Sequence, residues 1–275
     1  MDYSNLFGAK NIENGFAKAA CHSIIGHREY QQDCAGLAVK GDCLLAVLSD
    51  GMGGLSAGEV ASRHAVETLL RDFEQWGGQE RPGAFLVRET RMLDQQIHLM
   101  EDGEGKPLHA GATFIALILE GNLLHFVSVG DSRIYFFHGG RMYQLTRDHN
   151  YMTELLESLK KGEITQDYYE QESKGKRAEA LTSYLGMGGL KRLDVNASPI
   201  PFQEDDLMLV CCDGIYRSLS EEQIVALLLD NAIDTEVTAT RLVNEALRMS
   251  TGHQDNTTAI VLHPVKPDPE KTVEI

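Results

Sequence analysis

The hydrophobic residues of this chain fall into short aliphatic runs and into longer stretches in which they recur every three to four positions. Short runs between turn residues predict β-strands, whereas the longer spacing predicts amphipathic helices. Strands are expected at 17–25, 34–40, 43–49, 112–119, 123–129, 132–138, 206–212 and 257–263. Helices are expected at 56–75, 82–101, 149–160, 220–230 and 234–249.

The order of these elements favours an α+β fold, because strands and helices are grouped and do not strictly alternate. Helices are therefore expected to lie on antiparallel sheets, and not on a parallel doubly wound sheet. Residues 117–145 are interpreted as a meander, with Glu120–Asn122 and Gly139–Gly140 as its turns. Ser220 and Gln223 have the spacing of a capping box at a helix start.

Two segments differ from this pattern. Residues 150–180 are rich in Lys and Glu and hold two short helical patterns around Gly162, which predicts a surface flap. Residues 265–275 are polar and contain prolines, which predicts an extended or disordered tail. No internal repeat is visible, so residues 1–264 are expected to form one domain.

The charge balance limits the possible partners. The 275 residues include 25 Lys and Arg against 41 Asp and Glu, a net charge of -16. This excess argues against binding to nucleic acid or to an anionic membrane, since cations that neutralise phosphate are scarce. The sequence shows neither a signal-peptide pattern nor a long uncharged apolar segment, so a soluble cytoplasmic protein without membrane insertion is expected.

The cysteines are interpreted as buried thiols. Their number is odd, they show no CxxC spacing, and several lie in apolar runs, so neither disulfides nor a zinc site is expected. They are Cys21, Cys34, Cys43, Cys211 and Cys212.

Aspartates stand at the ends of several predicted strands. A carboxylate beside a buried strand is costly to desolvate unless a positive charge meets it, and few basic residues lie nearby in the sequence. A hard divalent cation would cancel the repulsion among acids gathered at one end of a pair of sheets, and all-oxygen ligation favours Mg²⁺ or Mn²⁺ over zinc. The residues are Asp33, Asp50, Asp131, Asp213 and Asp255.

Each motif also has an ordinary explanation when taken alone. Asp213–Gly214 has the sequence of a common turn, and the segment around Asp131 could be a hairpin turn. The glycine-rich segment after Asp50 lacks the Lys-Ser/Thr of a P-loop. It would let the backbone bend, offer a carbonyl ligand and leave space for a substrate. Five strand-end aspartates together are harder to explain as solvated turns.

Eight motifs in this order, spanning residues 18–263, resemble the metal-dependent serine/threonine protein phosphatases of the protein phosphatase 2C family in its bacterial form. The resemblance implies an α-β-β-α sandwich of two antiparallel sheets with a binuclear Mn²⁺ or Mg²⁺ centre between them. The motifs are REYQQD (28–33), DGMGGLSAGEVAS (50–62), GAT (111–113), GDSRIY (130–135), LTRDH (145–149), LTSYLG (181–186), DLMLVCCDG (206–214) and DNTT (255–258).

The same resemblance implies roles for single residues. Asp50 would bridge the two metals, and the carbonyl of Gly51 would bind one of them. Asp131 would help to hold a weaker third metal, shared with Asp213. Arg28 would bind phosphate through its planar guanidinium. The remaining ligands, partly through water, would be Asp33, Asp213 and Asp255.

The implied reaction is hydrolysis of phosphoserine and phosphothreonine. A water that bridges the metals would attack phosphorus in line with the leaving oxygen, while Asp50 holds the metals and Arg28 stabilises charge on the phosphoryl group. No covalent intermediate is needed, and no cysteine lies in a Cys-x5-Arg phosphate loop. The expected partners are phosphorylated proteins in bacterial signalling, including a Ser/Thr kinase or its targets, and the protein is expected to be a monomer.

The sequence departs from the family pattern in three motifs. Gln32 replaces a common Glu before the first metal-ligand Asp, which removes a charge near a metal. Met52 stands where eukaryotic members carry a His proposed as general acid, so water or another group would protonate the leaving oxygen. Ser183 and Tyr184 stand where many relatives carry an Arg followed by a small residue.

Alternatives to a protein phosphatase remain at this stage. A phosphatase-like binding module would keep the sheets and lose catalysis, and only Gln32 supports it. A hydrolase of small phosphate esters would share the metal centre and differ in the flap. The flap's basic residues could steer a phosphorylated loop or could form an ordinary solvated helix face. These residues are Lys160, Lys161, Lys174, Lys176 and Arg177.

Overall fold

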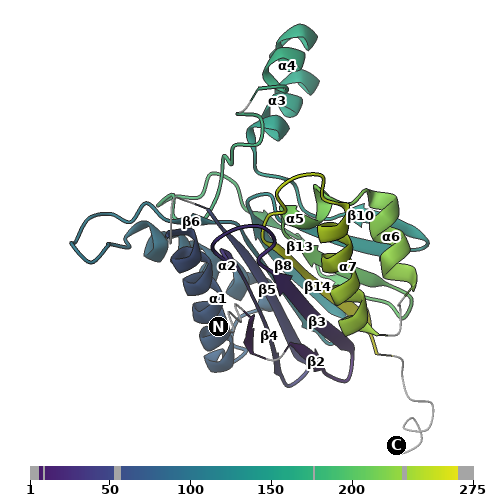
Figure 1. The fold of residues 1–275 in the computed structure, drawn as a ribbon. Coiled ribbons are helices and arrows are strands. Elements are labelled where there is room, and N and C mark those ends of the chain that lie inside the picture. The colour runs from purple at the N-terminus through teal and green to yellow at the C-terminus, as the bar shows by residue number, and fades with distance from the viewer. Residues whose placement is uncertain (1–5, 9, 53–56, 176, 231–233, 266–275) are drawn as a thin grey trace, which may run out of the picture.

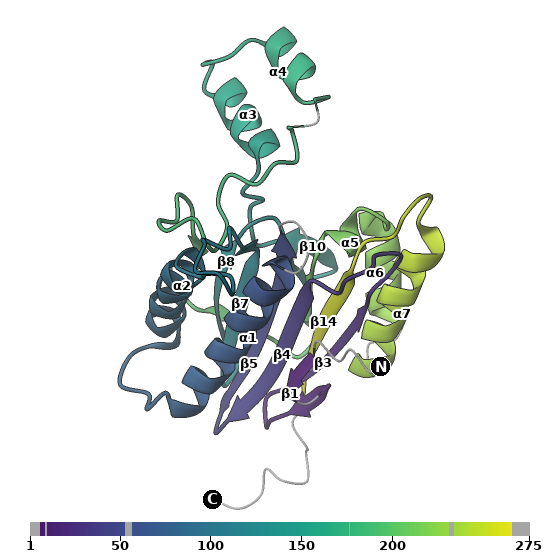
Figure 2. The same ribbon diagram turned by 60° about the vertical axis from the view of Figure 1, so that its left-hand side comes forward.

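A computed structural model of the chain describes residues 6–8, 10–52, 57–175, 177–230 and 234–265. Two β-sheets pack face to face, and helices cover the outer face of each (Figure 1; Figure 2). This arrangement confirms the predicted α+β class and the α-β-β-α sandwich.

The first sheet has eight strands in the order β1-β4-β5-β7-β8-β11, with β6 beside β5 and β12 beside β8. All of its pairs are antiparallel except that of β1 with β4, which is parallel and was not predicted. The strands are β1 (Leu6–Gly8), β4 (Asp33–Lys40), β5 (Cys43–Met52), β6 (Gly111–Ala112), β7 (Phe114–Glu120), β8 (Leu123–Val129), β11 (Asp194–Val195) and β12 (Ile200–Pro201).

The second sheet has six strands in the order β10-β9-β13-β14-β3-β2, and all of its pairs are antiparallel. Its two central strands are β13 and β14. Cys212, just after the C-terminal end of β13, and Thr258, at the N-terminal end of β14, both donate hydrogen bonds to Asp33 of the first sheet. The strands are β2 (Asn11–Glu13), β3 (Ala17–Ile24), β9 (Arg133–His138), β10 (Arg141–Gln144), β13 (Leu207–Cys211) and β14 (Thr257–Pro264).

The central strands are buried on both faces, which explains their uninterrupted hydrophobic runs. In β5, Leu44, Ala46 and Leu48 face the other sheet, whereas Leu45 and Val47 face the helices. Alternate residues of one strand therefore enter two different cores.

Two pairs of helices form the outer layers. α1 (Ala57–Gln75) and α2 (Pro82–His98) pack on the first sheet, and α6 (Glu221–Asp230) and α7 (Thr235–Met249) pack on the second. A further short helix, α5 (Asp213–Tyr216), follows β13 directly.

The predicted capping box is present at the start of α6. The Ser220 backbone N–H donates to Gln223 Oε1 at 2.8 Å, and the Gln223 N–H donates to Ser220 Oγ at 3.3 Å.

The prediction of one meander over 117–145 is wrong at its centre. β7 and β8 form a hairpin in the first sheet, whereas β9 and β10 form a hairpin in the second. The chain crosses between the sheets at Gly130–Ser132, where Gly130 has φ 100° and an added Cβ would lie 2.7 Å from Thr113. The local sequence thus encodes a crossing that places Asp131 between the sheets.

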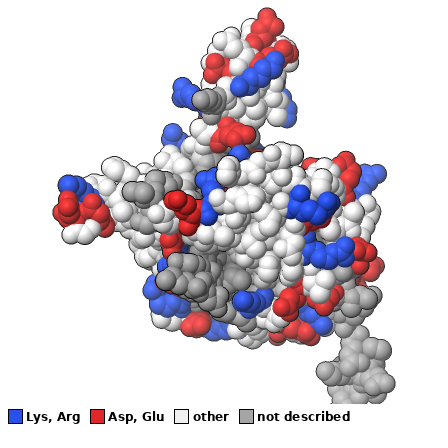
Figure 3. Space-filling model, viewed as in Figure 1, with Lys and Arg blue, Asp and Glu red and all other residues white. Residues whose placement is uncertain are grey.

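The predicted flap leaves the body as a pair of helices, α3 (Tyr151–Lys160) and α4 (Gln166–Glu172), at the top of Figure 1. Gly162 joins them with φ 73°, as the sequence indicated. The two ends of the flap are tied together, since the Met152 N–H donates to the Ala178 carbonyl at 2.8 Å. Figure 3 shows acidic and basic groups mixed on the flap.

Some predictions lie outside the described residues. These are the fate of the tail beyond residue 265, the glycines at 53 and 54, and the placement of Lys176. Within the described ranges, no helix is both long enough and apolar enough to cross a bilayer. The five cysteines are free, and all except the half-buried Cys43 are buried.

Candidate metal and phosphate site

Asp33 and Asp50 lie opposite each other on β4 and β5, in the first sheet. Asp33 is fully buried. Its carboxylate accepts hydrogen bonds from Thr258 Oγ1 at 2.6 Å and Cys212 Sγ at 3.2 Å, which belong to the side of the second sheet. These bonds fix the Asp33 carboxylate where the two sheets meet.

The backbone around Asp50 is held on both sides. The Asp50 N–H donates to Thr113 Oγ1 at 3.0 Å, and the Thr113 N–H donates back to the Asp50 carbonyl at 2.8 Å. At Gly51, an added Cβ would lie 2.1 Å from the Gly58 carbonyl oxygen at the start of α1. Only glycine fits there, so the motif after Asp50 reflects close packing of backbone against a helix.

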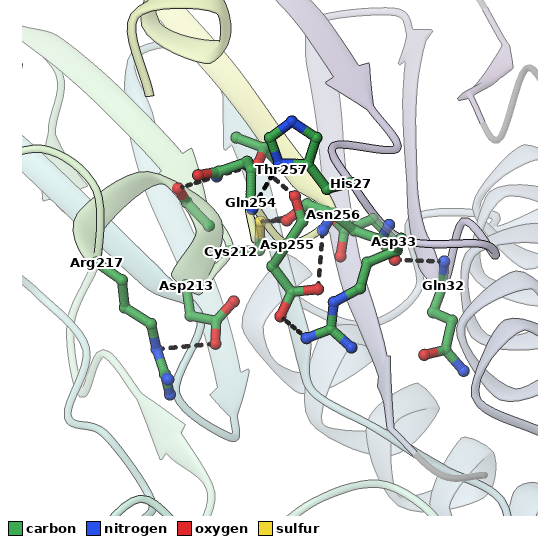
Figure 4. Close-up of polar contacts among 12 residues, drawn as sticks. His27, Gln32, Asp33, Cys212, Asp213, Arg217, Gln254, Asp255, Asn256 and Thr257 are labelled. Carbon is green, nitrogen blue, oxygen red and sulfur yellow. Dashed lines mark hydrogen bonds and ion pairs between the residues drawn. The ribbon is translucent and has the colours of Figure 1, made fainter. Parts of the chain in front are cut away.

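Asp213 and Asp255 come from the second sheet, after β13 and before β14. Both side chains line the cleft described below, and Figure 4 marks the contact of Asp213 with Arg217. Arg28 Nη2 lies 2.5 Å from Asp255 Oδ2, and Arg217 Nε lies 3.0 Å from Asp213 Oδ2. Each carboxylate therefore meets a guanidinium group.

Arg217 corrects the expectation that few basic residues lie near these acids. Besides Asp213, it reaches Glu179 Oε2 at 2.8 Å and Asp131 Oδ2 at 4.0 Å. Glu179 belongs to the end of the flap, so Arg217 joins the flap to the acidic cluster. The signal was present in the sequence, because Arg217 stands four residues after Asp213, the spacing of one helical turn.

Asn256 holds the loop that carries Arg28, a role that the sequence pattern did not predict. Its Oδ1 accepts from the Gln32 N–H at 2.8 Å, and its Nδ2 donates to the carbonyls of Ile25 at 2.9 Å and Tyr30 at 3.0 Å. The DNTT motif already contained Asn256 and Thr258, but the hydrogen bonds that these two side chains form were not predicted.

These elements enclose a cleft of about 370 Å³ between the ends of the two sheets. Every predicted site residue except Asp33 lines it, and Asp33 lies buried beside Asp50. The lining residues are Arg28, Gln32, Asp50, Gly51, Met52, Thr113, Asp131, Glu179, Ala180, Leu181, Asp213, Arg217, Asp255 and Asn256.

Burial and mutual repulsion make these acids reluctant to ionise. Burial, with smaller contributions from Asp213 and Asp255, raises the pKa of Asp33 to about 7, against the lowering effect of hydrogen bonds from Thr258 and Cys212. Burial, with Asp213, raises the pKa of Asp131 to about 7. Burial and then Asp33 raise the pKa of Asp50 well above its ordinary value. Arg28 and Arg217 thus neutralise the cluster only in part.

The donor set fits hard divalent cations. It consists of carboxylates and a backbone carbonyl, the ligands that Mg²⁺ and Mn²⁺ prefer, and such an ion would remove the repulsion that raises the pKa values. Among the residues that the structure describes, no three His, Cys, Asp or Glu side chains are arranged as a ready-made metal site. A cation held by Asp255 or Asp213 would compete with Arg28 or Arg217 for that carboxylate.

A family model described as protein phosphatase 2C matches residues 22–249. The chain belongs to the protein phosphatase 2C family. It is therefore an enzyme of a family of metal-dependent protein phosphatases, as the motifs predicted.

Individual members of the protein phosphatase 2C family agree with this assignment. The chain is 31% identical over 187 residues to the serine/threonine phosphatase stp of Listeria welshimeri, covering 67% of this chain and 71% of that protein. Its structure matches the Mycobacterium tuberculosis serine/threonine phosphatase PstP/Ppp with a TM-score of 0.74 at 27% identity, covering 90% and 98% of the two chains. A PstP catalytic domain in complex with two manganese ions matches with a TM-score of 0.69 at 28% identity, covering 91% and 99%.

The three departures from the family pattern occupy different places. Gln32 and Met52 line the cleft. Ser183 is buried away from it, donating to the Arg192 carbonyl at 2.8 Å. Tyr184 packs over Gly111, where an added Cβ would lie 2.9 Å from its ring. Ser183 and Tyr184 thus support the segment after the flap.

Proposed function

We propose that this chain is a serine/threonine protein phosphatase that works with two Mn²⁺ or Mg²⁺ ions in the cleft between its sheets. The observation that carries the proposal is that four strand-end aspartates and Arg28 line one cleft, with a fifth aspartate, Asp33, buried beside Asp50. The family match and the relatives named serine/threonine phosphatases support it.

In this proposal the aspartates divide the metal ligation. Asp50 and the Gly51 carbonyl would hold the two ions. Asp131, with Asp213, would help to hold a weaker third ion. The other groups that would hold the ions, partly through water, are Asp33, Asp213 and Asp255. The manganese-bound PstP structure supports two ions in this fold.

The protein's own residues position the phosphoryl group. When bound, the ions supply Lewis acidity and an activated water for in-line attack on phosphorus. Arg28 lies at the rim with its side chain 53% exposed, so it can release Asp255 and form a two-pronged contact with phosphoryl oxygens. Thr258 and Cys212 keep the Asp33 carboxylate oriented while the ions are held.

The remaining assignments belong to the same proposal. Residues 1–264 form one catalytic domain, which acts as a cytoplasmic monomer on phosphorylated proteins. Those substrates include a Ser/Thr kinase or the targets of that kinase. The mixed charges of the flap and its contact with Arg217 support a role for the flap in presenting a phosphorylated loop to the cleft.

A comparison of two substrates tests the proposal against its alternatives. We expect Mn²⁺-dependent release of phosphate from a phosphothreonine peptide, with no release in chelator. Turnover of p-nitrophenyl phosphate without turnover of the peptide would instead indicate a hydrolase of small esters. No turnover of either compound by folded protein, at any Mn²⁺ concentration, would indicate a binding module.

A further inference from the structure

A second hollow lies away from the cleft, between α2 and the segment that joins β11 to β12. Its volume is about 720 Å³, within the range of sites that bind drug-sized molecules. Ala84 is exposed in its wall, and so are Met92 (44%) and Val195 (46%). Figure 2 shows α2 beside β8 at one side of the molecule. The hollow therefore offers exposed apolar surface.

Two arginines along this groove are without an acidic partner. Arg81 and Arg91 stand on the same side of α2, and neither forms an ion pair or side-chain hydrogen bond with any residue that the structure describes. Arg81 is also the N-cap residue of α2, where the helix has no side-chain cap and its dipole adds positive charge. Both arginines are exposed, so each can meet an anion that enters the groove.

His125 adds an unsatisfied polar atom to the groove. The residue is 8% exposed, and its Nε2 is buried without a hydrogen-bond partner among the described residues. Its Nδ1 faces the first turn of α2, where a Cβ at Gly83 would lie 3.5 Å away. Glu120 Oε2 lies 3.8 Å from Nε2, which is beyond hydrogen-bond distance. Buried polar atoms are normally paired, which points to a ligand with a polar group.

We propose that this groove is a binding site, separate from the phosphatase cleft, for an aromatic monoanion with a drug-sized apolar body. The body would lie against Ala84, Met92 and Val195, and the acidic group would lie between Arg81 and Arg91. A small inorganic anion would leave the apolar wall in water. A polyanion would meet the carboxylates of Glu80 and Glu89, which already pair with Arg88.

The test uses 8-anilino-1-naphthalenesulfonate as the probe and the uncharged N-phenyl-1-naphthylamine as its matched analogue. We expect saturable binding of the sulfonate, followed by fluorescence, and weaker binding of the neutral compound. The double variant Arg81→Gln/Arg91→Gln should weaken sulfonate binding about tenfold, because it removes both charge-assisted contacts. The control Arg141→Gln, at an exposed position on β10, should bind as the unchanged protein does.

A second variant separates shape from charge. Ala84→Phe places an aromatic ring in the groove. Because the helix position is exposed, we expect the fold to be retained and the binding of the sulfonate to be blocked. Far-UV circular dichroism checks the fold of each variant. Sulfonate binding that is unaffected by both variants, or equal binding of the neutral analogue, would overturn the proposal. Neither readout depends on metal or on phosphatase activity.

Discussion

At the scale of single residues, the cleft concentrates negative charge that the protein neutralises only in part. Arg28 and Arg217 meet three of the five aspartates, Asp131 only at 4.0 Å, while Asp33 and Asp131 keep pKa values near 7. Cations that enter the cleft gain from this imbalance, and each added or removed charge changes their affinity.

The effect of one added charge on the affinity for cations can be measured most simply at Gln32. Gln32→Glu adds a carboxylate at a cleft-lining position, so we expect the Mn²⁺ concentration for half-maximal activity to fall about tenfold. The measurement is phosphate release from a phosphothreonine peptide as a function of Mn²⁺.

Gln75→Glu is the matched control, because it makes the same change at an exposed position at the far end of α1. We expect no change in its Mn²⁺ requirement. An unchanged or higher requirement in Gln32→Glu would mean that this position does not act on the metals.

The aspartates could be predicted from the sequence, because an acid that ends a hydrophobic run is conspicuous in itself. The tasks of Thr258, Cys212 and Asn256 could not be predicted in this way. Their partners lie more than a hundred residues away and meet them only where the two sheets join. Arg217 was an omission of a different kind, since its helical spacing from Asp213 was visible.

At the scale of elements, most strands and helices follow from hydrophobic spacing, and the errors arise where two topologies share one local pattern. The segment around Gly130 has the composition of a hairpin turn, yet it carries the chain from the first sheet to the second. Strands as short as β6, β11 and β12 have no hydrophobic period to detect and exist because a neighbour pairs with them. Tertiary contacts decide both cases.

The flap provides the prediction at this scale. Lys160 and Lys161 are exposed where α3 ends, and neither side chain forms an ion pair or hydrogen bond with a described residue. We expect Lys160→Gln/Lys161→Gln to raise KM for a phosphothreonine peptide about threefold to tenfold, because steering of the anionic substrate weakens. Hydrolysis of p-nitrophenyl phosphate should be unchanged.

Lys18→Gln/Lys106→Gln removes the same charge from exposed sites outside the flap and should leave both activities as they are. An equal rise in KM for both lysine pairs would show that net charge acts, and that the flap does not.

At the scale of the whole molecule, each sheet supplies part of one acidic cluster. Packing of the two sheets therefore brings together carboxylates that repel one another. The folded pKa of Asp33, about 7, lies above its ordinary value of 3.8. The folded protein therefore binds this proton more tightly than the unfolded chain does. Without metal, the contribution of Asp33 to the free energy of unfolding falls as the pH rises from 3.8 towards 7.

Asp33→Asn should consequently stabilise the metal-free protein at pH 7.5, by about 1 to 3 kcal/mol. The gain should shrink at pH 5, where the carboxyl of the unchanged protein is protonated. Urea unfolding in chelator at both pH values measures this. The exposed control Asp205→Asn should have no effect, and lower stability of Asp33→Asn at pH 7.5 would contradict the explanation.

The most direct test of the metal-centred phosphatase is the activity of Asp50→Asn. The change keeps the shape of the side chain and removes the charge proposed to bridge the ions, so we expect Mn²⁺-dependent release of phosphate from a phosphothreonine peptide to fall at least about a thousandfold. Asp205→Asn should keep full activity. Activity of folded Asp50→Asn within about tenfold of the unchanged protein would contradict the proposed centre.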